Sequence, residues 1–80
     1  MKLPRNVNGD RLAKALRRLG YERTRQRGSH IDMVTRRHGE HHVTVPEHRP
    51  IKPGTLNQLL KQVAEHHGMT RDELVNELKL

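Results

Sequence analysis

The spacing of apolar residues predicts a helix near the start of the chain. Leu12, Leu16 and Leu19 recur on one helical face, while four basic residues lie mostly off that face. Asn8 suits the N-cap, and Gly20 suits the left-handed residue that ends a helix. We therefore expect a helix between these two residues.

From residue 21 onward the apolar period changes to two. Apolar and polar residues alternate at 31–33 and again at 43–45, which is typical of strands that bury one face. The intervening residues 37–40, RHGE, predict a hairpin turn. Residues 21–27 predict a preceding strand, although charged residues carry most of its pattern.

The same alternation predicts which face of the sheet His30 occupies. If Ile31 and Met33 point inward, the period of two sends His30 and Asp32 to the opposite, exposed face. Val34 also falls on that face, which departs from a strict alternation.

Two further helices are predicted after a loop at 46–54 that contains three prolines. Apolar residues at 56–64 follow the spacing of one buried helical stripe, with Thr55 and Gln58 as an expected capping box and Gly68 as the expected end. Thr70 and Glu73 predict a second capping box, which begins a last helix.

The element order is therefore helix, three strands, helix, helix. Short connections predict an α+β fold in which a three-stranded antiparallel sheet carries its helices on one face.

The net charge of +7 is unevenly distributed along the chain. Residues 1–64 contain 14 Lys and Arg against five Asp and Glu, a balance of +9, whereas residues 65–80 contain two against four, a balance of −2. A positive field attracts polyanions, and the release of counterions from phosphates favours nucleic-acid binding. A solvated basic surface, or a surface for an acidic protein partner, is the alternative.

The amino-acid composition excludes several kinds of site and membrane-spanning segments. The chain has no cysteine, so it forms neither disulfides nor a thiolate zinc site. No segment approaches 18 consecutive apolar residues and no signal peptide is recognisable, so we expect a soluble, cytoplasmic protein that does not associate with membranes.

Five of the seven histidines lie in two groups that invite a metal interpretation. His41 and His42 are neighbours on a strand and point to opposite faces, so together with His38 they do not predict a metal site. His66 and His67 end a helix, where the helix dipole favours a positive imidazole.

Short motifs in a fixed order add a family resemblance. GSH at 28–30, VPEH at 45–48 and PGTL at 53–56 follow a helix that ends in LGY at 19–21. Their order and spacing through residues 8–67 resemble the HicA family, also called YcfA-like, of toxins from bacterial type II toxin-antitoxin modules. Eighty residues are about one small domain, so we expect a single domain over 1–80 in which residues 69–80 add a helix beyond the usual core of the family.

The resemblance implies a fold similar to a double-stranded-RNA-binding domain and an endoribonuclease activity on mRNA, that is, an mRNA interferase. It also implies neutralisation by a HicB-type antitoxin. We expect no metal and no small-molecule cofactor. In that family the histidine of the GSH motif is the functional residue, which corresponds to His30.

The chemistry of RNA cleavage suits a histidine at this position. Histidine titrates near neutral pH, so His30 can act as general base on a 2′-hydroxyl or as general acid to the leaving 5′-oxygen. Gly28 and Ser29 suit close approach to a phosphate, and Arg25 and Arg27 add positive charge. The alternative is an ordinary surface histidine.

The loop after the third strand supplies further candidates. His48 is a second proton-transfer group, a phosphate ligand or a structural residue, and Arg49 and Lys52 are candidate phosphate ligands. Tyr21 is the only aromatic residue, and its place after a helix end favours the core over base stacking. A non-catalytic RNA- or DNA-binding module remains the alternative to an enzyme.

Overall fold

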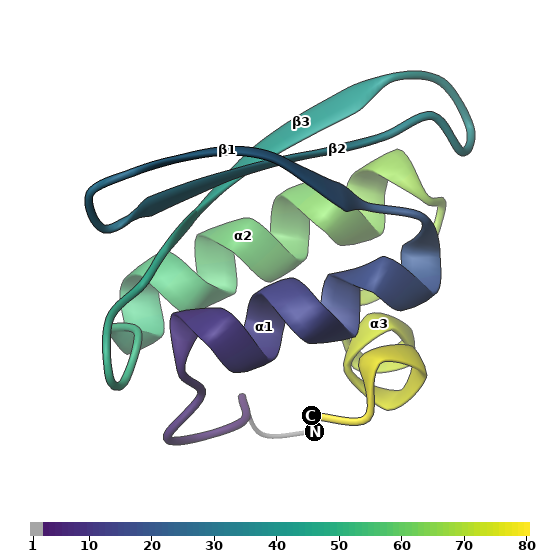
Figure 1. Cartoon of the computed structure of the whole chain (residues 1–80). Helices are drawn as coiled ribbons and strands as arrows, with labels where there is room; N and C mark the ends of the chain where they lie inside the picture. Colours follow the sequence, from purple (N-terminus) through teal and green to yellow (C-terminus); the bar gives the residue numbers. More distant parts are fainter. Residues whose placement is uncertain (1–2) are drawn as a thin grey trace.

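The computed structural model describes residues 3–80, whose elements follow the predicted order (Figure 1). Those elements are α1 (Gly9–Leu16), the 3-10 helix η1 (Arg17–Leu19), β1 (Glu22–Arg27), β2 (His30–Thr35), β3 (His41–Pro46), α2 (Pro53–His66) and α3 (Arg71–Leu78). The strands form an antiparallel sheet in the order β1-β2-β3. The predicted α+β architecture is thereby confirmed.

The helices cover one face of the sheet and leave the other to solvent. Figure 1 shows α1 and α2 side by side beneath the strands, with α3 farther from the sheet. α3 packs against α2 and buries Leu74, Val75 and Leu78. Among the described residues, no helix is long and apolar enough to cross a membrane.

The core lies between the sheet and the first two helices. The four apolar residues predicted to point inward from β2 and β3 are each at most 5% exposed, namely Ile31, Met33, Val43 and Val45. They meet the buried stripes of α1 and α2. Tyr21 is 1% exposed and belongs to this core, as its position after the first helix predicts.

β1 differs from the other strands because none of its side chains is buried. In the register with β2, Arg23 lies opposite Met33 and Gln26 lies opposite Ile31, so both occupy positions on the inward face. β1 is an edge strand, and polar side chains are tolerated there because only one of its sides is paired. The edge position of β1 therefore explains why this segment of the sequence can consist of charged and polar residues.

The start of α2 corrects one prediction. The helix begins at Pro53, with Lys52 at the N-cap and no side chain bonded to the helix end, so the expected Thr55–Gln58 capping box is absent. Proline has its φ fixed near the helical value and lacks the N–H that a first helical residue leaves unpaired, so the helix starts three residues earlier than the predicted box implies.

The other predicted helix ends lie where the sequence places them, although the side chain of Asn8, at the N-cap of α1, makes no capping bond. Gly20 and Gly68 both adopt positive φ after their helices. In α3 the predicted capping box is complete: the Glu73 amide donates to the Thr70 hydroxyl at 3.1 Å, and the Thr70 amide donates to the Glu73 carboxylate at 2.9 Å.

Candidate functional site

The solvent-facing side of the sheet carries His30. In the strand register His30 pairs with Arg27 of β1 and with Pro46 of β3, and its imidazole is exposed, as the alternation predicts. Within residues 3–80 this side chain makes no hydrogen bond and no ion pair. Its two ring nitrogens are therefore available to a molecule from outside.

A shallow open depression of about 410 Å³ lies beside His30. It brings together two sequence-predicted candidates from the loop after β3, since its lining residues are His30, Thr44, Pro46, His48, Lys52 and Thr55. Arg49 is exposed in the same loop but does not line the depression. The site thus combines two imidazoles and one ammonium group.

Asp32 organises the outer face next to the depression. Its carboxylate accepts a hydrogen bond from the Thr44 hydroxyl at 3.1 Å and pairs with the Arg27 guanidinium at 3.3 Å. This pair holds Arg27 on the face that carries His30. Arg25 lies on the same face, opposite Asp32 in the register, and is exposed. The alternation predicts the face of Asp32 but not its partners.

Gly28 and Ser29 form the tight turn that precedes His30. Gly28 has φ +56°, and no atom lies within 4 Å of the position that a Cβ would take there. The Ser29 carbonyl accepts a 2.6 Å hydrogen bond from the Glu47 amide. This backbone bond joins the turn before His30 to the loop that carries His48.

Gly9 holds the same loop from the side of α1. Its amide donates to the His48 carbonyl at 3.1 Å, and the Ile51 amide donates to the Val7 carbonyl at 2.9 Å. A Cβ on Gly9 would lie 2.1 Å from the Pro46 carbonyl oxygen. The sequence contains no signal for this close approach, because the two backbone segments that meet are far apart along the chain.

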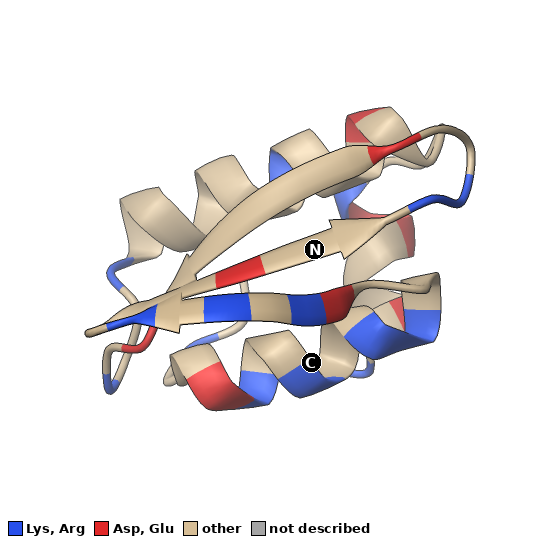
Figure 2. Cartoon of the chain, turned by 45° about the horizontal axis from the view of Figure 1, so that its top comes forward, with Lys and Arg blue, Asp and Glu red and all other residues tan. Residues whose placement is uncertain are grey.

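Basic side chains continue from the sheet onto α1. Figure 2 shows Lys and Arg along β1 and along the helix next to it. Asp10 pairs there with Arg23 at 2.7 Å and with Lys14 at 3.3 Å. The hydrogen bond from Arg23, followed by that from Lys14, lowers the pKa of Asp10.

A second group of histidines gathers around Tyr21, at the end of the sheet where the β2–β3 hairpin turns. The Tyr21 hydroxyl lies 2.7 Å from Nδ1 of His41 and 3.2 Å from Nε2 of His67, so it donates to one ring and accepts from the other. His66 stacks on His41 with centroids 4.4 Å apart, and its Nε2 donates to the carbonyls of Arg37 and Gly39.

The environment of this group opposes positive charge. Burial, with neighbouring histidines as further causes, lowers the pKa of both His41 and His67. At His67, burial and the neighbouring charges therefore oppose the positive imidazole that the helix dipole was expected to favour. In the part of the chain that the structure describes, no three His, Cys, Asp or Glu side chains are arranged to hold a metal ion.

One comparison with known proteins gives a match. The sequence model of a protein family described as "HicA toxin of bacterial toxin-antitoxin" matches residues 9–64, which is more than half of the chain. The match ends within the last turn of α2 and therefore does not include α3. No curated protein and no solved structure matches the chain.

Proposed function

Given that this chain belongs to the HicA toxin family of bacterial toxin-antitoxin systems, we propose that it is an endoribonuclease that cleaves mRNA and thereby stops translation. The observation that carries the proposal is the depression in which His30, exposed and without a hydrogen bond or ion pair to any of residues 3–80, meets His48 and Lys52.

The proposed reaction uses the nucleophile that RNA itself contains. The 2′-oxygen attacks the adjacent phosphorus while its proton passes to one imidazole, and the bond from phosphorus to the 5′-oxygen breaks as that oxygen receives a proton. The products are a 2′,3′-cyclic phosphate and a 5′-hydroxyl end. Each positioned proton transfer contributes about 10²- to 10⁴-fold in rate.

We assign one proton transfer to His30 and the other to His48. The position of Lys52 in the same depression supports a role for its ammonium group in binding the phosphate that reacts. Arg25 and Arg27 lie on the same outer face as His30, and Arg49 lies in the same loop as His48, so all three suit neighbouring phosphates. At the turn, the open space beside Gly28 suits approach of the RNA backbone to Gly28 and Ser29. The step itself requires no metal ion and no organic cofactor.

Cleavage of a long transcript by the purified protein tests the proposal. We expect His30→Ala to lose cleavage by at least about 10²-fold, the contribution of one proton-transfer group, and the wild type to stay active in the presence of EDTA. His42→Ala is the matched control, because His42 is exposed on the same outer face, opposite Val34, but does not line the depression.

The result also separates the enzyme from a binding module. If the wild-type protein shifts the transcript in a gel and leaves it intact, the chain is an RNA-binding protein without nuclease activity. If His30→Ala cleaves as fast as the wild type, the assignment of His30 is wrong.

The partner in this proposal is a HicB-type antitoxin with an acidic surface. Asp and Glu side chains placed over Arg25 and Arg27 would occupy the path of the phosphates and cover His30, and opposite charge speeds association. We expect charge reversal of Arg25 and Arg27 to slow association with the antitoxin at low salt. Unchanged association would show that the antitoxin binds elsewhere.

A further inference from the structure

We propose that Gln26 is a positioning residue that fixes the His48 loop, residues 47–52, against the turn that precedes His30. The inference rests on the proposed function for its catalytic consequence. Its structural part stands on contacts that link two segments far apart in the sequence.

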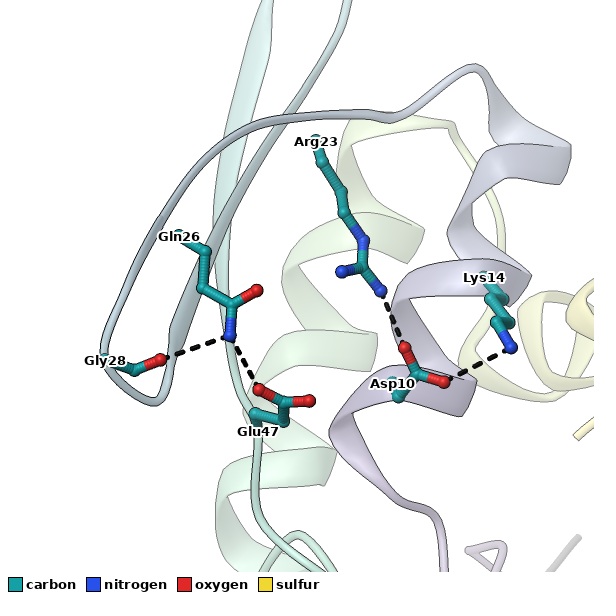
Figure 3. Close-up of polar contacts among 6 residues, drawn as sticks. All are labelled: Asp10, Lys14, Arg23, Gln26, Gly28 and Glu47. Atoms are coloured by element: carbon teal, nitrogen blue, oxygen red, sulfur yellow. Dashed lines mark hydrogen bonds and ion pairs between the residues drawn. The ribbon is translucent and has the colours of Figure 1, made fainter.

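The side-chain amide of Gln26 makes two hydrogen bonds. Its Nε2 donates to the Gly28 carbonyl at 3.2 Å and to the Glu47 carboxylate at 2.7 Å (Figure 3). Among residues 3–80, the bond between Gln26 and Glu47 is the one side-chain hydrogen bond that joins the turn to the His48 loop. The backbone bond from the Glu47 amide to the Ser29 carbonyl runs alongside it.

The position of Gln26 explains why it reaches this loop. It lies opposite Ile31 on the inward face of β1, yet it is exposed because β1 is an edge strand. Its amide therefore extends past the end of the core toward Glu47, which is half-buried and directly precedes His48. Arg23, the other inward position of β1, instead contacts Asp10 and ties the strand to α1 (Figure 3).

These contacts bear on catalysis because the two imidazoles belong to different segments. A proton-transfer group must lie within hydrogen-bond reach of its proton, and a displacement of about 1 Å can cost about 10²-fold in rate. Without the amide of Gln26, the turn and the His48 loop keep only their backbone bond on this side. The spacing of His30 and His48 is then less well defined.

The kinetic test uses Gln26→Ala and one exchange of partners. We expect Gln26→Ala to lower kcat by about tenfold or more while KM changes little, since the phosphate ligands are intact. Gln26→Glu alone places two carboxylates next to each other, so we expect its kcat to be no higher than that of Gln26→Ala. Combining Gln26→Glu with Glu47→Gln restores a donor and an acceptor in reverse order and recovers part of the lost kcat.

The matched control is Asp10→Ala. It removes the contact of the other inward side chain of β1 but touches neither histidine segment, so we expect kcat to stay at the wild-type value. A loss of kcat in Asp10→Ala equal to that in Gln26→Ala would overturn the proposal, because general loosening of β1 would then explain both. A rise in KM without a fall in kcat would also overturn it.

Amide exchange measured by NMR tests the positioning without reference to activity. Gln26→Ala should accelerate exchange of the Glu47 amide, while amides of the β2–β3 ladder keep their protection and Asp10→Ala leaves the Glu47 amide unchanged. If Gln26→Ala does not alter this amide, Gln26 does not hold the loop. If the wild type cleaves no RNA at all, the proposed function fails, and the exchange result still decides whether Gln26 positions the loop.

Discussion

At the scale of single residues, Gly9 provides a sharp test of how the His48 loop is placed. Gly9→Ala would put a methyl group 2.1 Å from the Pro46 carbonyl oxygen and 2.6 Å from the Glu47 Cα. Because both contacts are backbone, the loop has to move, and we expect a loss of about 2 kcal/mol in the free energy of unfolding. Urea denaturation measures this change.

Gly54→Ala is the matched control for Gly9→Ala. Gly54 lies in the first turn of α2, and nothing lies within 4 Å of the position that a Cβ would take there. Alanine is the better helix former, so we expect a gain of about 0.5 to 1 kcal/mol. Equal losses in the two variants would mean that close packing at Gly9 is not the cause.

The sequence predicts the position of His30 but not the contacts that surround it. The period of two places His30 on the outer face, because successive side chains along a strand point to opposite faces of the sheet. The bond between Gln26 and Glu47 joins residues 21 positions apart, and both are polar and not buried, so no periodic pattern marks them. Contacts of this kind depend on how strands and loops come together.

At the scale of secondary-structure elements, the two predicted capping boxes make a direct comparison. Thr70→Ala removes the hydroxyl that accepts from the Glu73 amide, so we expect α3 to lose about 1 kcal/mol. Thr55→Ala, inside α2, removes a hydroxyl that caps nothing, and we expect a change within about 0.5 kcal/mol. Thermal denaturation of the two variants checks the difference.

Similar losses in Thr70→Ala and Thr55→Ala would contradict this assignment of helix ends. The comparison also explains an error of the sequence prediction. Both segments contain Thr followed three residues later by Glu or Gln, but only α2 has a proline that can occupy the first helical position before the threonine. A capping motif therefore predicts the start of a helix only where no residue before it, such as a proline, favours an earlier start.

At the scale of the whole molecule, the histidines around Tyr21 predict a dependence of stability on pH. Burial lowers the pKa of His41 and His67 in the folded state, whereas in the unfolded chain they bind protons near pH 6.5. Below about that pH the unfolded state binds more protons, so the free energy of unfolding falls as pH decreases toward the lowered folded values. Urea denaturation at pH 7.5 and 5.5 measures this fall.

His67→Gln should reduce the difference between the two pH values, because one of the two perturbed imidazoles is absent. His48→Gln replaces an exposed imidazole that contributes to neither pKa shift, so it should keep the wild-type difference. If the wild type is equally stable at pH 7.5 and 5.5, protonation of this group does not oppose folding.

The basic outer face predicts how RNA binding depends on salt. The proposed role of His30 predicts that His30→Ala does not cleave RNA. In that background, removing Arg25 and Arg27 should reduce the slope of log K against log salt by about 1.4, two phosphate contacts at about 0.7 each. Removing Lys61 of α2 and Lys79, which follows α3, should leave the slope unchanged, since both are exposed away from the sheet. An unaltered slope in the Arg25 and Arg27 variant would place the phosphates elsewhere.

The edge strand β1 has a consequence for the lifetime of the protein. Because β1 buries no side chain, its separation from β2 exposes little of the apolar core and costs less than opening any other part of the sheet. A protease that cuts after arginine can therefore cut after Arg23, Arg25 or Arg27 of β1 as well as after the arginines of the exposed loops. A cut in β1 severs the strand paired with His30, so a single cut there would disable the proposed active site.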